Sequence, residues 1–395
     1  MLVSLQATTR TSPVPVASFA LGAGLSAASL YYNQPVLAAM ASSFHATAKQ
    51  VGVVPMLTQL GYASGILLFA PFGDRRDRRQ VIVVKLAALS LSLLLAGFAP
   101  SLSLLAAASL AIGLSATAAQ DFVPAAAALA PPERRGKIVG SVMTGLLLGI
   151  LLSRLASGAV SERYGWRVVY FGAAGAIAAL AIVSAVRVPS MAPTTQEPYG
   201  KLLRSMLSLT RDLGALRRAT LAQALLSFAF SAFWSTLALA LAAPPHHLGS
   251  TAAGLFGLAG AAGAAVAPLA GAMADKRGPE LVIRAGATLV VLSFAGMALW
   301  PASLPLLIVG TVVFDLGVQA SLISHQSIIY GLDGAARSRL NAVLVSSMFF
   351  GMGAGAAAAS QVLGHYGWPA VMWLGAFASA LALVVRYWPA PRSAA

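Results

Sequence analysis

The feature that most constrains the fold is a series of long apolar runs. Each run is about 20 residues long, enough for a helix to cross a hydrocarbon core of roughly 30 Å. Because no water is available inside a bilayer, a segment that crosses it must satisfy its own backbone, as a helix does. The sequence therefore predicts an all-α membrane protein with twelve transmembrane helices. The expected spans are 15–41, 50–72, 80–99, 103–129, 138–160, 167–186, 219–242, 251–273, 282–300, 304–330, 339–362 and 368–387.

Composition supports this class and argues against a water-soluble one. Hydrophobic residues make up 58% of the 395 residues and charged residues only 9%, against about 25% charged residues in a typical soluble domain. Too few polar side chains remain to cover a soluble surface. The runs are also too long for a membrane β-barrel and lack its alternating pattern.

The chain repeats itself at a nearly constant offset. Fixed-period self-similarity is a strong indication of architecture, and the repeat predicts two pseudo-symmetric six-helix bundles. The expected domains are residues 1–187, a linker at 188–218 and residues 219–395. The landmarks are Asp74 and Asp275, 201 residues apart, and three pairs 202 apart: Gly165 with Gly367, Arg135 with Arg337, and Gly149 with Gly351.

The basic residues predict the orientation in the membrane. The net charge is +15, and 22 of the 26 Lys and Arg residues fall on one side if the N-terminus is cytoplasmic. This positive-inside bias predicts cytoplasmic termini in a multi-pass protein of the bacterial inner membrane. The same residues lie in short clusters at helix ends, so a nucleic-acid partner is not expected. In the linker, apolar and basic positions separate at helical spacing over 201–211, which predicts an amphipathic helix along the inner membrane surface.

The loops after the second and eighth helices carry related short motifs. One copy has Asp74, Arg75, Arg78 and Arg79, with Asp77 where the second copy has Gly278. The second copy has Gly271, Asp275, Lys276 and Gly278. With two six-helix halves and a long connecting loop, these motifs resemble those of the major facilitator superfamily of secondary transporters. The resemblance implies that the two motif loops take part in gating.

Two further segments resemble the twelve-helix bacterial drug and metabolite proton antiporters within that superfamily. They are Tyr31-Tyr32-Asn33-Gln34-Pro35 and the small-residue run from Gly145 to Gly158. The resemblance implies export of small organic molecules by alternating access, in exchange for protons. A proton-coupled symporter or facilitator that imports a sugar or organic acid is the alternative. The expected partners are a small-molecule substrate, protons and membrane lipid, with no cofactor or metal and a monomeric chain.

Three formally charged residues lie well inside the predicted spans: Asp121, Arg154 and Asp315. A charge at the centre of a bilayer costs about 2.5–3.5 kcal/mol even on lenient scales, so such residues usually serve function. Their repeat mates are the uncharged Ile323, Ala356 and Gly113, so the duplicated scaffold does not require them. We expect Arg154 to attract anionic or polar substrate groups, and Asp121 and Asp315 to carry protons. Helix geometry places Asp121 and Arg154 about 10 Å apart in depth, so separate roles are expected.

Other polar and aromatic residues within the spans are candidates for a central cavity. An interfacial aromatic belt is the alternative for the aromatic ones. His325 is a candidate proton relay. Small residues of the fifth and eleventh helices are expected at the surfaces between the halves. The cavity candidates are Tyr31, Tyr32, Asn33, Gln34, Gln59, Tyr62, Arg154, Phe233, Trp234 and Gln319.

The sequence lacks the motifs of other functional classes. It contains no His-Glu-x-x-His run, no nucleophile elbow and no cysteine, which argues against an intramembrane enzyme. It also has no Gly-x-x-x-x-Gly-Lys-Ser/Thr loop, which argues against an ATP-driven pump.

The gating role of the first motif loop predicts the behaviour of one substitution. Asp74→Asn removes a carboxylate that can form charge-assisted bonds near the inner surface. We expect transport in membrane vesicles to fall while the amount of membrane-inserted protein stays unchanged. Normal flux in this variant would contradict the gating role.

Overall fold

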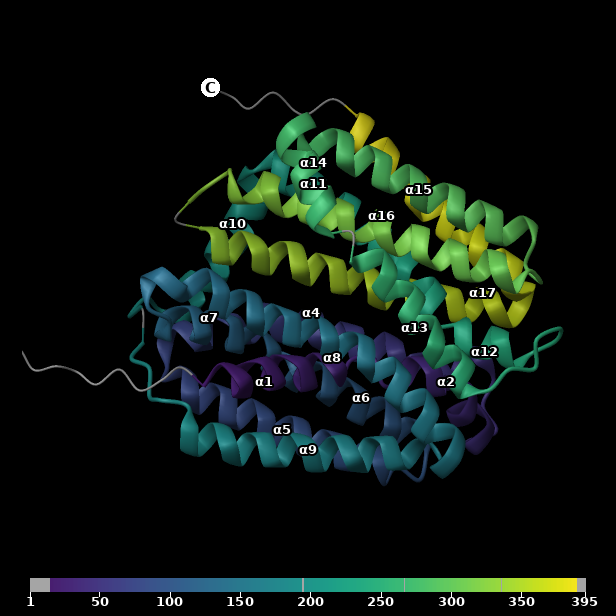
Figure 1. Ribbon diagram of the computed structural model, residues 1–395, viewed down its shortest axis with the longest axis horizontal. Coiled ribbons are helices and arrows are strands. Elements are labelled where there is room, and N and C mark those ends of the chain that lie inside the picture. Colours follow the sequence, from purple (N-terminus) through teal and green to yellow (C-terminus); the bar gives the residue numbers. More distant parts are fainter. Residues whose placement is uncertain (1–14, 194, 266, 335, 389–395) are drawn as a thin grey trace, which may run out of the picture.

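The computed structural model describes residues 15–388 except 194, 266 and 335; the side chains at 70, 71, 74, 264, 267 and 268 also lie outside this description. Every regular element in the described part is helical. Nine of the described helices are long and apolar enough to cross a membrane. The helices lie side by side along the long axis of the molecule (Figure 1). The predicted all-α membrane architecture is confirmed.

The first half of the chain consists of nine α-helices and one short 3₁₀ helix, an arrangement that fits six membrane-crossing segments. Three of these segments are broken within their length. The elements are α1 (Val16–Ala28), α2 (Asn33–Ser43), α3 (Ala48–Val51), α4 (Val53–Arg75), α5 (Arg78–Gly97), α6 (Leu102–Ala116), α7 (Ala119–Leu129), η1 (Pro132–Arg134), α8 (Arg135–Tyr164) and α9 (Trp166–Arg187).

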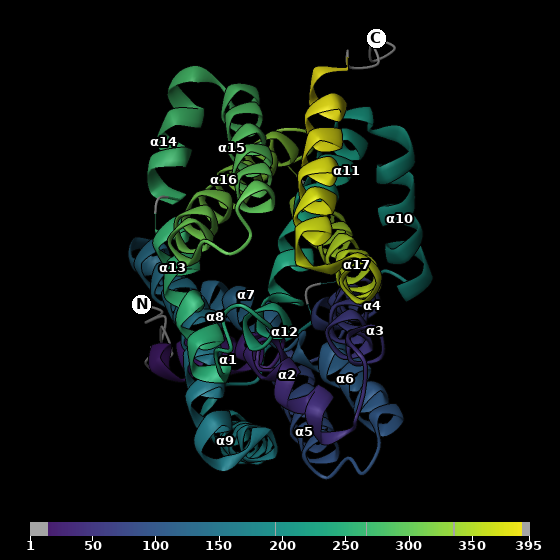
Figure 2. The same ribbon diagram turned by 90° about the vertical axis from the view of Figure 1, so that its right-hand side faces the viewer.

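The second half follows the same plan after a linker helix. Its elements are α10 (Tyr199–Asp212) in the linker, then α11 (Gly214–Trp234), α12 (Leu237–Ala242), α13 (Ser250–Ala264), α14 (Ala267–Arg277), α15 (Pro279–Leu299), α16 (Leu304–Tyr330) and α17 (Arg337–Tyr387). Helix α10 forms where the amphipathic pattern predicts one. Viewed along the helices, the first half (purple to blue) and the second half (green to yellow) form two bundles in contact (Figure 2).

Helix α17 contains two predicted spans that meet at Gly367. The backbone leaves helical geometry there, with φ 76°. Gly165, its repeat mate, has φ 88° between α8 and α9. This left-handed region strongly favours glycine. The twofold repeat seen in the sequence is therefore present in the backbone, and the two parts of α17 complete a set that fits twelve spans.

The predicted first span is interrupted near its middle, and the seventh span is interrupted closer to its C-terminal end. Between α1 and α2, Pro35 has no N–H to give to the carbonyl of Tyr31, and the amide of Gln34 bonds to that carbonyl instead. Ser29 Oγ also donates to the carbonyl of Leu25, a bond that bends helices. Ser235 makes the equivalent bond to Ser231 between α11 and α12. The breaks leave aromatic and polar side chains at the boundary between the halves.

We name the two ends of the bundle by their landmarks. The linker end holds α10 and the loop between α4 and α5, and the far end holds the breaks at Gly165 and Gly367. Close contacts between the halves lie toward the far end, where the amide of Thr251 donates to Glu162 Oε2 at 2.7 Å. A methyl group at Gly158 of α8 would lie 2.4 Å from the carbonyl oxygen of Ser250 in α13. Only glycine permits this approach.

The sequence predicted that the small residues of the fifth and eleventh spans lie between the halves. This is only partly correct, because some of them pack within one half. Gly149 of α8 packs against Gly24 of α1 within the first half. Gly351 of α17 packs against Ala224 of α11 within the second half, whereas Gly353 packs against Leu60 of α4 across the boundary. Adjacent faces of one helix therefore serve internal packing and contact between the halves.

The linker is attached to the first motif loop through Asp77. Its carboxylate caps α5 by accepting from the amide of Arg79 at 3.0 Å, and it accepts from the amide of Met191 at 3.0 Å and the hydroxyl of Ser190 at 2.6 Å. Desolvation alone would raise the Asp77 pKa, but these hydrogen bonds outweigh it and hold the pKa below its ordinary value. The attachment is therefore present at neutral pH and is lost as pH falls through that lowered pKa. Further along, Tyr199 Oη donates to the carbonyl of Leu68 in α4 at 2.8 Å.

Substitution of Asp77 should release the start of the linker. In Asp77→Ala, the amides of Arg79 and Met191 lose their acceptor, and loss of the cap costs about 0.5–2 kcal/mol of helix stability. We expect both amides to exchange hydrogen for deuterium faster, as measured by mass spectrometry. Ser190→Ala is the matched control, because it removes one bond and leaves both amides paired. Unchanged exchange at Met191 in Asp77→Ala would contradict this attachment.

Candidate functional site

Arg154 of α8 is buried between the two halves, with 5% of its surface exposed. Its Nε donates to Gln34 Oε1 of α2 at 2.8 Å. Its guanidinium carbon lies 4.6 Å from the ring centre of Tyr31 and 4.3 Å from that of Trp234. These distances are those of cation–π interactions. Because Trp234 belongs to the second half and Tyr31 to the first, the cation joins the two halves.

Asp315 of α16 is also buried, next to Trp234. A methyl group at Gly260 of α13 would lie 2.6 Å from Asp315 Oδ2 and 3.0 Å from the Trp234 ring, so these side chains adjoin. Arg154 and Asp315 interact electrostatically, although no direct ion pair joins them among the described side chains. We call Tyr31, Gln34, Arg154, Trp234 and Asp315 the central cluster.

Both charges of the central cluster keep unused hydrogen-bonding capacity. Arg154 Nη2 and Asp315 Oδ2 are buried without a partner in the part of the chain that the structure describes. Buried polar groups normally have partners, so an unpaired donor and an unpaired acceptor at one boundary mark a site that can bind a polar group or a proton. The gap beside Arg154, bordered by Gln34, Trp234 and Leu237, is too narrow to admit a water molecule.

The breaks in the first and seventh spans position the side chains of the central cluster. Tyr31 lies in the turn between α1 and α2, and Gln34 is the second residue of α2. Trp234 is the last residue of α11, before the second break. Side chains next to these breaks therefore meet Arg154 from both halves.

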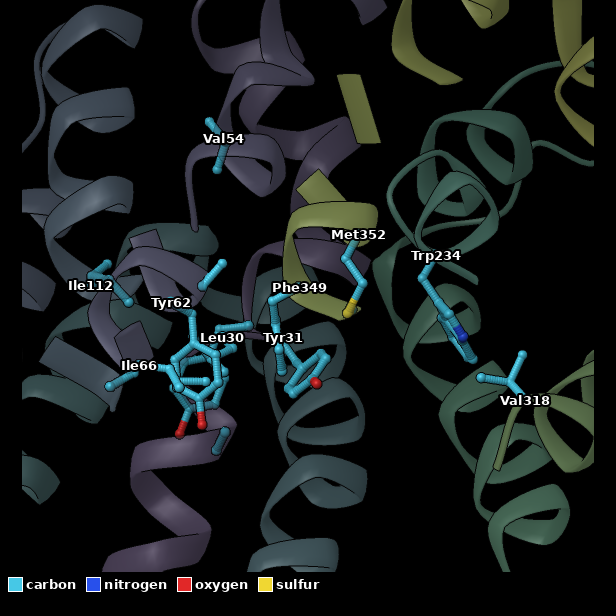
Figure 3. Packing of buried hydrophobic residues seen from close by; sticks show 14 of the residues in the cluster. Leu30, Tyr31, Val54, Tyr62, Ile66, Ile112, Trp234, Val318, Phe349 and Met352 are labelled. Atoms are coloured by element: carbon cyan, nitrogen blue, oxygen red, sulfur yellow. The ribbon is translucent and has the colours of Figure 1, made fainter. Parts of the chain in front are cut away.

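An aromatic group adjoins the cluster on the side of the first half. The rings of Tyr62 in α4 and Phe349 in α17 lie 4.4 Å apart, which links the halves a second time. Gln120 Nε2 donates to the Tyr62 hydroxyl at 2.8 Å. Figure 3 shows Tyr31, Tyr62 and Phe349 together, with Trp234 across from them on α11. The alternative of an interfacial belt does not fit these tyrosines, because they are buried.

The remaining cavity candidates are placed around this region with varied partners. Asn33 Nδ2 donates to Thr58 Oγ1 at 3.2 Å within the first half. Gln59 is fully buried, and neither polar atom of its amide has a partner within the described residues. Tyr32 is buried and Gln319 half-buried. Phe233 is directed elsewhere, into the aromatic core of the second half, where its ring lies 4.9 Å from Phe314.

Comparison with known proteins decides the family. The family model described as "Major Facilitator Superfamily" matches residues 19–329 and 219–395. The chain belongs to the major facilitator superfamily. It is 37% identical to "Uncharacterized transporter YgaY" of Escherichia coli O157:H7 over 374 residues, 95% of each chain. The protein is accordingly a membrane transporter and not an enzyme.

Two other comparisons concern a named efflux pump and a named symporter. A stretch of 115 residues is 30% identical to "Chloramphenicol efflux pump Rv0191" of Mycobacterium tuberculosis (strain ATCC 25618 / H37Rv), covering 29% of this chain and 28% of that one. The fold matches the crystal structure of a D-xylose-proton symporter with a TM-score of 0.76 at 13% identity, covering 96% of this chain and 98% of that chain. At this identity the second comparison concerns the fold alone.

Asp121 of α7 lies apart from the central cluster. Its Oδ2 pairs with Lys85 Nζ of α5 at 2.6 Å, and both side chains are about nine-tenths buried. A methyl group at Gly73 would lie 2.9 Å from Asp121 Oδ1, so the pair adjoins the first motif loop. Lys85 was not expected as a partner of Asp121 from the sequence. Its position inside the expected span 80–99 was the available signal.

His325 is fully buried inside the second half. Its Nδ1 lies 3.0 Å from Gln223 Oε1 of α11, and its Nε2 has no partner among the residues described. Gln223 was not singled out from the sequence, because nothing in the spacing shows that α11 and α16 meet there. The proton-relay role of His325 stays a prediction.

The gating motifs are described only in part. The side chain of Asp74 lies outside the described residues, while Arg78 Nε donates to the carbonyl of Gly73 at 3.3 Å. Arg75 is the last residue of α4, and Arg79 lies in the first turn of α5. In the second copy Asp275 and Lys276 are exposed on α14, Gly271 is half-buried, and Gly278 has φ 87° before α15.

The pair of Lys85 and Asp121 should behave as a structural unit. Removing one partner leaves an uncompensated buried charge and costs about 3–5 kcal/mol, whereas replacing both by apolar residues is often neutral. We expect Lys85→Met to lower the temperature at which the protein loses its monodisperse size-exclusion peak. The double variant Lys85→Met/Asp121→Leu should recover most of that loss. If both variants are equally unstable, the pair is not the source of the effect.

Proposed function

We propose that this protein exports small organic molecules across the bacterial inner membrane in exchange for protons. The observation that carries the proposal is the central cluster, in which a cation from one half and an acid from the other are both buried next to Trp234. Any motion that separates the halves at the far end exposes both charges, so their protonation and ligand state are coupled to that motion.

The described contacts suggest which state the structure represents. Thr251 with Glu162 and Gly158 with Ser250 close the far end. The linker end carries most of the basic residues, which favours a cytoplasmic location for it and for both termini. We infer a state that is closed toward the outside and receives substrate from the cytoplasm.

In this proposal Arg154 binds the substrate and Asp315 binds the proton. Arg154 offers Nη2 to an anionic or polar group of the substrate, while the rings of Tyr31 and Trp234 contact its apolar part. Asp315 binds a proton from the outside at its carboxylate and releases it to the cytoplasm after the halves have moved back. Protonation removes the attraction between Asp315 and Arg154, so proton binding and tight closure around Arg154 oppose each other.

Two features support export over import. The relative named as a chloramphenicol efflux pump is similar over part of the chain, and the aromatic lining suits amphipathic solutes. The alternative, proton-coupled uptake of a sugar or organic acid, is favoured by one observation: a buried arginine with a free donor is a good carboxylate ligand. The direction of proton-driven flux in vesicles of known sidedness separates the two.

Substitution of Asp315 should separate transport from proton coupling. In proteoliposomes with an imposed pH gradient, we expect wild-type protein to accumulate chloramphenicol against its gradient and to release protons when chloramphenicol is added. Asp315→Asn should abolish uphill accumulation and proton release but retain chloramphenicol exchange without a gradient. Arg154→Gln should lower both uphill accumulation and chloramphenicol exchange by at least tenfold, because it removes the guanidinium that binds the substrate.

Glu197→Gln is the matched control, since Glu197 is an exposed carboxylate on the linker, paired with Lys201. It should leave all these rates unchanged. Gradient-driven accumulation that persists in Asp315→Asn would overturn the assignment of the proton site. If chloramphenicol is not transported, the same measurements with sugars and organic acids decide between export and the alternative.

A further inference from the structure

Three arginines meet at the linker end of the second half. Helix α17 runs from the break at Gly367 to its end at Tyr387, so its Arg386 lies at the end opposite that break. Arg218 of α11 and Arg284 of α15 reach the same place from the neighbouring helices. Figure 2 shows the last part of α17 (yellow) between α15 and α11. We call Arg218, Arg284 and Arg386 the arginine cluster.

Part of the arginine cluster stabilises the protein itself. Arg386 is 2% exposed, and its guanidinium pairs with the carboxylate of Glu280, with Nε 3.2 Å from Oε2. Nη2 of Arg218 and Nη2 of Arg284 donate to the carbonyl oxygen of Arg386 at 3.0 and 3.2 Å. Cations at the C-terminus of a helix satisfy its last carbonyls and interact favourably with its dipole. This structural role explains Arg386 and one edge of each of the other two guanidiniums.

The structural role leaves positive charge and hydrogen-bond donors unused. Glu280 is the one carboxylate in ion-pair contact with the cluster in the part of the chain that the structure describes, so two of the three positive charges have none. The charges of Arg218 and Arg284 also repel that of Arg386. Nη1 of Arg218 and Nη1 of Arg284 donate no hydrogen bond to the described residues, and neither atom is enclosed. These two half-buried side chains therefore present N–H groups outward at one place.

Aromatic residues place the arginine cluster at the level of the lipid headgroups. Tyr387 and Trp388 are 63% and 71% exposed and end the last span. Tyrosine and tryptophan are enriched where a membrane helix meets the interface. The guanidinium carbon of Arg284 lies 4.4 Å from the ring centre of Tyr387. The cluster and these aromatic side chains therefore lie at one depth.

We propose that the arginine cluster binds a phosphate-bearing anion, namely the headgroup of an anionic phospholipid in the adjoining leaflet. Guanidinium groups bind phosphate oxygens through paired N–H donors, and basic pockets between membrane helices take such headgroups. A bound phosphate supplies the missing counter-charge and stabilises the junction of α11, α15 and α17. Free phosphate offers the same chemistry and is the other source. The site shares no residue with the central cluster.

Ligand-dependent stability of the purified protein tests the site. The protein is stripped of lipid in detergent and heated with added ligand, and the temperature at which half of its monodisperse size-exclusion peak is lost is measured. A ligand that binds only the folded state raises this temperature. We expect phosphatidylglycerol to raise it in a saturable way, and phosphatidylcholine, whose headgroup has no net charge, to have little effect.

Substitutions locate the binding. Arg218→Gln/Arg284→Gln should raise the half-saturating concentration of phosphatidylglycerol at least tenfold, because charge-assisted hydrogen bonds to the phosphate are lost. Arg218→Lys/Arg284→Lys keeps both charges and should retain most of the stabilisation. Arg134→Gln/Arg135→Gln is the matched control. It removes two positive charges from exposed side chains of the first half and should leave the half-saturating concentration unchanged.

The ligands distinguish the two sources. Stabilisation by phosphatidylglycerol and not by inorganic phosphate supports the lipid site. Stabilisation by inorganic phosphate alone would overturn the lipid as occupant and assign the cluster to a soluble anion. No stabilisation by either ligand would overturn the site, as would equal half-saturating concentrations in wild type and Arg218→Gln/Arg284→Gln.

Two further variants keep the test decisive. If the double variant does not fold, Arg284→Gln replaces it, because Arg218 still donates to the carbonyl of Arg386. Arg154→Gln should keep the full stabilisation by phosphatidylglycerol even where it stops transport. Failure of the lipid site is therefore distinguishable from failure of the proposed transport function.

Discussion

A guanidinium and a carboxylate buried where two helix bundles meet set the conditions for the rest of this structure. A lone charge at mid-bilayer costs about 2.5–3.5 kcal/mol or more, so Arg154 and Asp315 must face protein. Arg154 is stabilised by the amide of Gln34 and by the rings of Tyr31 and Trp234. Because Trp234 comes from the other half, its part of this stabilisation is present only while the halves are in contact. The contact of Arg154 with Trp234 thus helps to hold the two halves together.

The breaks in the first and seventh spans make this arrangement possible. An unbroken helix satisfies its backbone hydrogen bonds internally and presents only side chains. In the first and seventh spans, Pro35 and the hydroxyls of Ser29 and Ser235 interrupt this series of backbone hydrogen bonds. Interrupted backbone is tolerated at membrane depth only where protein or a polar cavity surrounds it. The breaks and the central cluster therefore occupy one region for the same physical reason.

Other buried polar pairs lie within single halves. Lys85 with Asp121 connects neighbouring helices of the first half, and Gln223 with His325 does the same in the second. A pair inside one bundle is not pulled apart when the bundles move against each other. Such pairs suit a stable rigid body, while the central cluster, shared between bodies, suits coupling. Asp121 next to Gly73 also brings one rigid-body pair close to the first motif loop.

The sequence by itself determined the membrane class and the twofold repeat. Long apolar runs permit only helices in lipid, and the glycine pair Gly165 and Gly367 appears in both halves with the same left-handed backbone. It did not determine which way each helix is turned. In a soluble helix the polar face reveals the rotation, but in a membrane helix the lipid-facing and protein-facing sides are both apolar. The neighbours Phe233 and Trp234 therefore looked equivalent, and only the packing showed that one fills a core while the other contacts Arg154. The same limitation hid the partnership of Lys85 with Asp121, because the facing sides of α5 and α7 are known only from the folded bundle.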